Sequence, residues 1–344
     1  NSPSMSGEVA PMVASVVPTF NEGKWIGRCL DSLLAQTHPS SRHIIHVVDG
    51  GSTDDTLNIV RSKMKEDVKI VLIKNPEKRV PQARNLSLAA MDEEVELVFE
   101  VNGHGWVPVD HLEKRISDLQ EIESELAKKV GGVGCLVVAA EDEGRTMMGD
   151  WIESTLSCPL GSGGGQFARF KGRHPHNVPA FVLHRKEALL EVGGWDEGLP
   201  TNQDSDLSMR LIKADWPLWR SDVSSFQMVK RRNLSSFVKM CRRYGFWRTK
   251  TLKKHKSRVN PKEFLPIIGL LLTAILFATQ NDYRYYPLLI YAVAISLIGL
   301  YEAMKFRMPS LLIGVPLLLL ILHTQFSIGM VEGVFRKKLE LVDR

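Results

Sequence analysis

The chain has 344 residues, of which 44% are hydrophobic and 24% are charged. This composition excludes an intrinsically disordered chain, and the length excludes a disulfide-stapled miniature. The four cysteines are far apart and form no CxxC pair, which excludes a zinc ribbon and, by spacing, an iron–sulfur cluster. Residues 1–10 are interpreted as a cloning remnant, Asn1–Ser4, followed by a disordered start.

The first 220 residues alternate short apolar runs with helical segments. Strands are expected at Met12–Val17, Ile44–Val48, Val68–Ile73 and Val95–Val101, and helices at Trp25–Ala35, Thr53–Lys65 and Pro81–Met91. Repeated strand–helix units predict an α/β fold with a doubly wound, mostly parallel sheet, which we assign to residues 11–227. Ligands bind such sheets beyond the carboxyl ends of the strands, so the candidate site residues follow the first, second and fourth strands.

The loops after these three strands are polar. Pro18–Glu22 follows the first strand, Asp49–Asp55 the second, and Glu100–His104 lies at the end of the fourth. The Asp-Gly-Gly-Ser-Thr-Asp segment fits a tight turn followed by a helix N-cap. That interpretation accounts for the glycines but not for Asp49, whose carboxylate can accept a hydrogen bond from a nucleobase.

Five motifs in chain order carry a family resemblance. Val16–Glu22, Val48–Asp54, Ala83–Asn85, Gly193–Glu197 and Gln203–Leu211 resemble the motifs of family 2 glycosyltransferases, which have a GT-A nucleotide-sugar-binding fold. Arg243–Trp247 and the apolar tail resemble the succinoglycan-biosynthesis branch of that family, whose members extend lipid-linked sugars. Each motif alone is weak, but together they cover nearly the whole chain.

The resemblance implies a set of site residues. The donor would be bound by Pro18, Thr19, Glu22, Asp49, Gly50, Arg84 and Asn102. Asp204 would be the general base, in the first turn of a helix that begins near Gln203 after a possible Asn202 cap. Without the resemblance, Asp204 would be interpreted as a surface acid favoured by the helix dipole.

The expected metal motif departs from the family pattern. The family usually has Asp-x-Asp, or Asp-Gly-His in this branch, where this chain has Asn102-Gly103-His104. Asn102 and His104 are the predicted ligands of a divalent cation, Mn²⁺ or Mg²⁺, and imidazole favours Mn²⁺. Glu100 is a candidate to supply the negative charge that is lost because Asn102 replaces an Asp. Alternatively, Arg84, Lys78 or Arg79 neutralises the leaving diphosphate.

A basic segment precedes the apolar tail. Residues 228–262 contain thirteen Lys or Arg and no Asp or Glu, so the rest of the chain is net acidic. We expect a basic juxtamembrane segment whose residues 233–256 form an interfacial helix; an ordinary helix packed on the soluble domain is the alternative. Arg242, Arg243 and Trp247 are predicted to contact the lipid phosphate of the acceptor. The position of the basic segment favours a membrane over a nucleic acid as the anionic partner.

Three apolar stretches follow, at Phe264–Thr279, Pro287–Ala303 and Ser310–Gly333. Each is close to the length that crosses a bilayer, so residues 263–335 are predicted to form about three spans, with a basic tail at 336–344. Three spans place this tail on the far side of the membrane from the basic segment, against the positive-inside tendency. The last stretch, broken by Pro316, is therefore either re-entrant or an exception.

The resulting expectation is an inverting glycosyltransferase of the cell membrane with a cytoplasmic catalytic domain. It would move a sugar from a nucleotide sugar to a hydroxyl of a polyprenyl-(di)phosphate-linked saccharide, and the resemblance implies UDP as the nucleotide. The alternatives are a polyprenyl-phosphate monosaccharide synthase and a non-catalytic nucleotide-sugar-binding scaffold. The Gly161–Gly165 run lacks the Gly-Lys-Ser/Thr of a P-loop, which excludes that ATPase motif, and is either a mobile loop or a linker.

Overall fold

The computed structural model describes residues 9–64, 67–141, 144, 146–162, 168–337 and 339. The expected start at 1–8, most of the glycine run and most of the basic tail lie outside the described residues. The chain forms two compact units. The N-terminal unit comprises Asn1–Ala140 and Phe170–Val229, and the C-terminal unit comprises Glu141–Arg169 and Lys230–Arg344.

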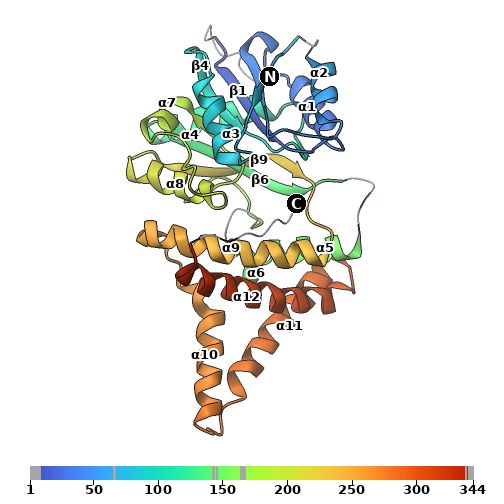
Figure 1. The fold of residues 1–344 in the computed structure, drawn as a ribbon, viewed down its shortest axis with the longest axis vertical. Coiled ribbons are helices and arrows are strands. Elements are labelled where there is room, and N and C mark those ends of the chain that lie inside the picture. Colours follow the sequence, from blue (N-terminus) through green and yellow to red (C-terminus); the bar gives the residue numbers. More distant parts are fainter. Residues whose placement is uncertain are drawn as a thin grey trace. The chain divides into compact units, whose positions relative to one another are not determined.

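The described part of the N-terminal unit contains a nine-stranded sheet (Figure 1). Its strands are β1 Met12–Thr19, β2 His43–Asp49, β3 Lys69–Lys74, β4 Val95–Glu100, β5 Gly105–Trp106, β6 Gly132–Ala139, β7 His174–Pro175, β8 Leu183–Arg185 and β9 Leu218–Met228. Their order is β3-β2-β1-β4-β8-β6-β9-β5, and β7 pairs with β9. Strands β1 to β4 pair in parallel, as do β6 and β9, whereas β8 runs antiparallel to β4 and β6. The predicted doubly wound, mostly parallel sheet is confirmed.

Helices cover both faces of this sheet. They are α1 Ile26–Leu34, α2 Thr56–Lys63, α3 Val80–Ala89, α4 His111–Leu126, α7 Lys186–Glu191 and α8 Gln203–Lys213, with a short 3-10 turn at Ser40–Arg42. One buried cluster joins α3, α7 and α8 to β1, β2 and β4. Right-handed connections place α1 and α2 on the opposite face from α3. Every residue of β2 is buried, which agrees with its apolar residues Ile44, Ile45, Val47 and Val48.

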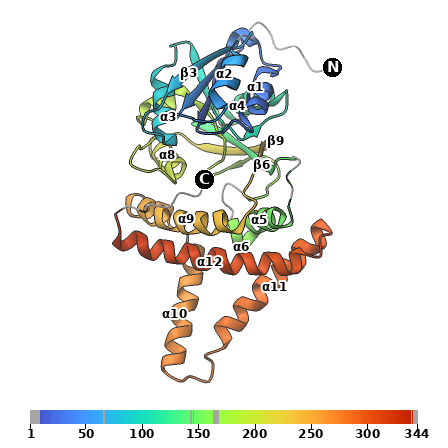
Figure 2. The same ribbon diagram turned by 45° about the vertical axis from the view of Figure 1, so that its right-hand side comes forward.

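The C-terminal unit is helical. It contains α5 Met147–Ser157, α6 Pro159–Ser162, α9 Leu234–Lys254, α10 Leu265–Ala278, α11 Tyr286–Phe306 and α12 Leu311–Phe335, with 3-10 turns at Lys256–Arg258 and Pro261–Phe264. Helix α9 begins where Asn233 caps it by accepting a hydrogen bond from the Ser236 N–H at 2.8 Å. Helices α9 and α12 lie side by side, while α10 and α11 run away from this pair as a hairpin (Figures 1 and 2).

Three helices among the described residues are long and apolar enough to cross a membrane: Pro261–Ala278, Tyr286–Phe306 and Leu311–Phe335. They correspond to the three predicted apolar stretches and indicate a membrane association. Their burial within the protein differs, from 0% for the first to 39% for the last. Helix α12 is therefore in an environment different from that of α10.

The described residues between Glu141 and Arg169 belong to the C-terminal unit, whereas the sequence predicts one continuous domain over residues 11–227. The reason is the apolar face of α5. Ile152 is fully buried in a cluster with Phe237 of α9 and Leu318 of α12. Ser154 donates a hydrogen bond to the buried Glu302 of α11 at 2.7 Å. The sheet domain is thus discontinuous in sequence.

Candidate active site

The carboxyl ends of β1 and β2 meet at one point of the sheet edge. Thr19 and Asp49 are register partners, and the Gly50 N–H donates to the Thr19 carbonyl at 2.8 Å. The buried Asp49 carboxylate accepts hydrogen bonds from the Gly51 and Ser52 N–H groups at 2.8 and 3.0 Å and from the Ser52 hydroxyl at 2.5 Å. Gly51 has a φ of +83°, which favours glycine. The turn therefore holds Asp49 in one orientation.

Glu22 connects the end of β1 with the loop that follows β4. Its Oε1 lies 2.8 Å from Nδ1 of His104, and both side chains are largely buried. A Cβ atom on Gly103 would lie 3.1 Å from Cγ of Glu22, so the absence of a side chain there permits the close approach of the two loops. The predicted donor residues Pro18, Thr19, Glu22, Asp49 and Gly50 thus lie along the same edge as Asn102 and His104.

Asn102 and His104, the predicted metal ligands, do not form a site that could hold a divalent cation without further ligands. Divalent cations such as Mg²⁺ prefer anionic oxygen ligands. Asn102 and His104 offer only an amide and an imidazole, and the imidazole is engaged by Glu22. No group of three or more His, Cys, Asp or Glu side chains in the described residues is placed to hold a metal ion. Glu100, considered as a source of the missing charge, lies in a different cluster.

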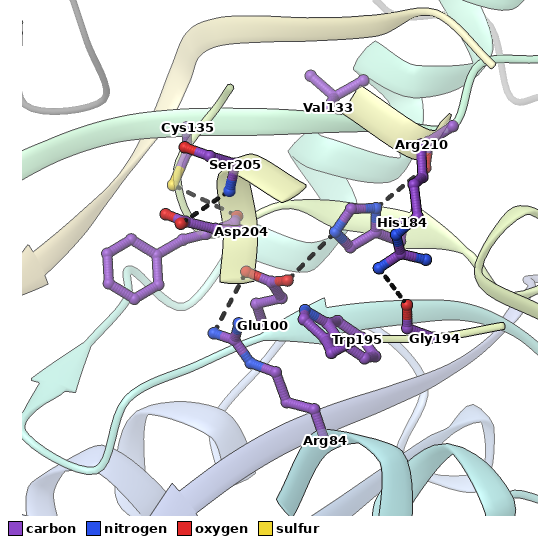
Figure 3. Close-up of polar contacts among 12 residues, drawn as sticks. Arg84, Glu100, Val133, Cys135, His184, Gly194, Trp195, Asp204, Ser205 and Arg210 are labelled. Carbon is purple, nitrogen blue, oxygen red and sulfur yellow. Dashed lines mark hydrogen bonds and ion pairs between the residues drawn. The ribbon is translucent and has the colours of Figure 1, made fainter. Parts of the chain in front are cut away.

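That cluster is a buried ion-pair network at the end of β4. The Glu100 carboxylate lies 3.4 Å from Nη2 of Arg84 and 3.3 Å from Nε2 of His184 (Figure 3). Burial by itself raises the pKa of Glu100, but Arg84 and His184 outweigh it, so the pKa is below its usual value. The Arg84 guanidinium also lies over the Trp195 ring, 5.5 Å from its centroid. Its Nε and Nη1 are buried and make no hydrogen bond to any described residue.

Asp204 lies beside this network, in the first turn of α8 (Figure 3). Helix α8 begins at Gln203 as expected, although Asn202 adopts a left-handed conformation and makes no side-chain cap. The partly buried Asp204 carboxylate accepts a hydrogen bond from the Ser205 N–H at 2.8 Å. Burial raises the pKa of Asp204; that hydrogen bond and Arg84 oppose the shift, and the Glu100 charge adds to it. A carboxylate with a raised pKa is a stronger base.

Two side chains hold the Gly193–Glu197 loop next to this acid. Asn85 donates to the Trp195 carbonyl and accepts from the Trp195 N–H, both at 2.8 Å. Arg210 of α8 donates to the carbonyls of Val192 and Gly194 at 2.6 and 2.7 Å. The motifs at Ala83–Asn85, Gly193–Glu197 and Gln203–Leu211, which are far apart in sequence, are therefore in direct contact.

The predicted acceptor residues lie on α9, in the C-terminal unit. Arg242 forms a two-point contact with Glu332 of α12, with Nε to Oε2 at 2.7 Å. The Arg243 guanidinium lies over the Tyr244 ring, 5.6 Å from its centroid. Trp247 is buried against Phe246. Their contact with a lipid phosphate stays a prediction.

Sequence reasoning missed three features of this site. The sequence gives no signal for His184, yet this side chain is buried and contacts Glu100. The pairing of Glu22 with His104 was also missed, as was the clamp that Asn85 forms on the Trp195 backbone. Glu22 and Asn85 lie within the motifs Val16–Glu22 and Ala83–Asn85, but neither motif indicates the partner of its side chain.

Comparisons of the sequence with known proteins identify the family. The family model described as glycosyl transferase family 2 matches residues 15–190. The succinoglycan biosynthesis protein ExoA of Rhizobium meliloti (strain 1021) is 27% identical over 295 residues, covering 86% of each chain. A dolichyl N-acetyl-alpha-D-glucosaminyl phosphate 3-beta-D-2,3-diacetamido-2,3-dideoxy-beta-D-glucuronosyltransferase of Methanococcus voltae is 26% identical over 335 residues, covering 94% of this chain and 97% of that protein.

A solved structure shares the fold. The mannosyltransferase PcManGT from Pyrobaculum calidifontis, in complex with GDP-Man and Mn²⁺, superposes with a TM-score of 0.56 at 17% sequence identity, covering 95% of this chain and 88% of that one. The predicted GT-A architecture is confirmed by this likeness. The family match ends before α8, so the role of Asp204 depends on its geometry and on the resemblance of the Gln203–Leu211 motif.

Proposed function

Since the chain belongs to glycosyl transferase family 2 and is a glycosyltransferase, we propose that it transfers a sugar, with inversion, from a nucleotide sugar to a hydroxyl of a polyprenyl-linked saccharide. The observation that carries this proposal is the Asp204 carboxylate, whose raised pKa and position beside Arg84 suit a general base next to a leaving diphosphate. The proposal includes UDP as the nucleotide, the cell membrane as location, and a cytoplasmic catalytic domain.

The nucleotide is proposed to bind where β1 and β2 end. A carboxylate has about four acceptor positions, and the Asp49 turn uses three of them. The remaining position is available for a nucleobase N–H, and the fixed orientation lowers the entropy cost of binding. Gly50 has no side chain to obstruct a flat ligand, while Pro18 and Thr19 line the same edge.

The acceptor hydroxyl is proposed to lose its proton to Asp204 as its oxygen attacks the anomeric carbon from the face opposite the diphosphate. A neutral hydroxyl is a poor nucleophile, and a positioned base accelerates such a step by roughly 10²–10⁴-fold. The Glu100 charge, which raises the pKa of Asp204, makes that carboxylate a better proton acceptor. Glu100 and His184 are positioning residues in this mechanism.

The departing diphosphate gains negative charge, which nearby cations must stabilise. Arg84 is proposed for this role because two of its buried donors are without a partner among the described residues. Lys78, in the loop beside Gly50 and Gly51, is a second candidate. Asn102 is proposed as a further contact to the donor. No step is assigned to a metal ion, because Asn102 and His104 do not form a site by themselves.

A lipid-linked acceptor is supported by the relatives and by the C-terminal unit. ExoA is named for succinoglycan biosynthesis, and the Methanococcus protein is named for transfer to a dolichyl-linked sugar phosphate. In this chain, three apolar helices follow a segment with thirteen cationic residues. We propose that Arg242, Arg243 and Trp247 lie near the acceptor phosphate, with Arg242 exchanging its contact to Glu332.

The substitution Asp204→Asn tests the mechanism. Transfer of a radiolabelled sugar to a lipid-linked saccharide in membranes should fall about 10²–10⁴-fold, because the base is removed. Binding of UDP, measured by calorimetry on the purified protein, should be unchanged. Asp92→Asn, an exposed acid on the same unit, is the matched control and should retain full activity.

Two experimental outcomes would each favour one of the alternative functions. A phosphate monoester has a second pKa near 6 and is already ionised, so it needs little help from a base. Asp204→Asn with most of its activity retained would therefore favour the polyprenyl-phosphate synthase. Tight nucleotide binding by the unmodified chain, without turnover of any donor, would favour the scaffold.

A further inference from the structure

Helices α9 and α12 pack in parallel along almost their full lengths. Near the start of α9, Phe237 and Met240 share a buried cluster with Leu318. Further along, glycines bring the backbones together. A Cβ atom on Gly245 would lie 2.0 Å from the Phe326 carbonyl oxygen, and one on Gly329 would lie 2.0 Å from that of Arg242. Small residues at such positions permit close helix contact.

Polar contacts fix the same pairing at the C-terminal ends of both helices. The Thr249 hydroxyl donates to the Met330 carbonyl at 2.9 Å. Lys253 donates to the Val334 carbonyl at 3.2 Å, and Lys250 to the Arg336 carbonyl. The two-point contact of Arg242 with Glu332 lies between these and the apolar cluster. The two helices therefore behave as one packed pair.

This pairing determines where α12 can lie. Helix α9 carries seven Lys or Arg residues in 21 positions and cannot cross a hydrocarbon core. A helix that stays in parallel contact with α9 from Leu318 to Val334 cannot cross that core either. Helix α12 is nevertheless apolar, with Glu332 as its only acidic residue and no Lys or Arg.

The face of α12 that points away from α9 is an apolar stripe interrupted by one exposed polar residue, Thr324. Its members recur at helical spacing and are 40–81% exposed: Ile313, Leu317, Leu320, Ile328, Val331 and Phe335. Exposed cations lie at both ends, Lys305 and Arg307 before the helix and Arg336 and Lys337 after it. An apolar face between cationic ends suits the boundary between phospholipid headgroups and acyl chains.

We propose that α12 lies in the plane of one phospholipid leaflet, on its apolar stripe, and that only α10 and α11 cross the bilayer. Helix α11 packs on α12 at Gly299, where an added Cβ atom would lie 2.7 Å from Cδ of Pro316. Two crossings return the chain to its starting side. The basic tail then lies on the same side as the basic segment 228–262, which satisfies the positive-inside tendency.

The number of membrane crossings is tested by labelling introduced cysteines from one side of the membrane at a time. The full chain is expressed with Lys305→Cys or Lys337→Cys, which flank α12, and with Asp282→Cys at the tip of the hairpin as the matched variant. Each is treated with a membrane-impermeant maleimide in spheroplasts and in inverted membrane vesicles. The four native cysteines are buried, and the unmodified chain gives the background.

Lys305→Cys and Lys337→Cys should react in the same preparation, and Asp282→Cys in the other. Reaction of Lys305→Cys and Lys337→Cys in opposite preparations would mean that α12 crosses the bilayer and would overturn the proposal. Reaction of all three variants in the same preparation would mean that the hairpin does not cross, which would overturn it as well.

Depth measurements test the orientation of α12 independently. Nitroxide labels are placed at Ile313→Cys, Leu320→Cys and Val331→Cys in vesicles of phosphatidylethanolamine and phosphatidylglycerol, with Leu297→Cys at the middle of α11 as the reference. Accessibility to oxygen and to a nickel chelate should give one shallow depth for the three α12 positions and a deep one for Leu297→Cys. A central depth at Leu320→Cys, with shallow depths at the other two, would overturn the proposal.

Discussion

Glu100 of the N-terminal unit and Glu302 of the C-terminal unit are both buried carboxylates paired with an arginine, but their arginines differ. Arg84 directs one nitrogen to Glu100, at 3.4 Å, and keeps Nε and Nη1 buried without a partner in the described chain. Arg169 directs Nη1 to Glu302 at 3.0 Å and Nη2 to the Ser157 hydroxyl. Glu302 also accepts the Ser154 hydroxyl.

We interpret this difference as one between a proposed binding site at Arg84 and a structural contact at Arg169. A buried donor that makes no hydrogen bond costs about 1–3 kcal/mol of stability. Such a donor is expected where a bound ligand accepts its hydrogen bond. The pair at Arg169 is completed by the protein and joins α11 to the segment 141–169. The two pairs should therefore respond differently to substitution.

Among the variants of these two ion pairs, Arg84→Gln is expected to have the largest effect on transfer. Without the guanidinium, the developing diphosphate charge loses a partner, and transfer should fall about 10²–10³-fold. Removal of Arg84 also leaves Glu100 buried with only His184, so the melting temperature in detergent should fall. The double variant with Glu100→Gln removes both charges and should recover the melting temperature but not the activity. Recovery of activity in the double variant would show that Arg84 is structural, like Arg169.

Glu302→Gln should lower the stability of the protein but have little effect on transfer. It leaves the Arg169 charge without its counterion, and because Arg169 is one-third exposed the cost is expected at about 1–3 kcal/mol. The melting temperature should fall, while transfer at a permissive temperature should change less than twofold. Glu94→Gln, from an exposed pair with Arg42, is the control and should stay within about 0.5 kcal/mol. A selective loss of transfer in Glu302→Gln would break the comparison.

The parts of this molecule that the sequence predicted are those with local causes. Strands β1 to β4 are continuous or alternating apolar runs, and the Asp49 turn is specified by adjacent glycines and Ser52. The contacts of Glu100 are not local. Arg84 and His184 reach it only because α3 crosses to one face of the sheet and β8 pairs with β4. Neither the spacing nor the residue types indicated that arrangement.

The C-terminal unit shows a different limit. Hydropathy measures how apolar a helix is but not what covers it. Leu318 and Leu319 are buried by protein, whereas Ile313 and Leu320 on the same helix are exposed. A hydropathy average treats the four residues alike, so in the sequence only Pro316 and the positive-inside tendency set the last stretch apart from the first. The sequence also does not indicate that Ser154 contacts Glu302, because the two residues are 148 positions apart. The sequence therefore predicts the segment 141–169 within the sheet domain.

A smaller effect is expected from Asn102→Asp, which tests whether the N-terminal site accepts added charge. The substitution supplies the carboxylate that the donor set lacks, so the affinity for Mn²⁺ in the presence of UDP should rise about tenfold. Titration of free Mn²⁺ by electron paramagnetic resonance measures this. Asn85→Asp, at the structural clamp on Trp195, is the matched variant and should not raise the affinity. An unchanged affinity in Asn102→Asp would place residue 102 away from the diphosphate.

The smallest effect is expected in the pH dependence of kcat/KM. In this measurement, substitutions of Glu100 and of Glu302 should give different results. Asp204 must be ionised to act as a base, and its raised pKa means that kcat/KM should fall on acidification at a higher pH than for an ordinary aspartate. In Glu100→Gln the neighbouring negative charge is gone and Arg84 is free to interact with Asp204, so the acidic limb should move to lower pH. Glu302→Gln, measured at a permissive temperature, should leave that limb where it is. An acidic limb that shifts equally in both variants, or in neither, would mean that Asp204 is not the titrating base and that Glu100 does not act through it.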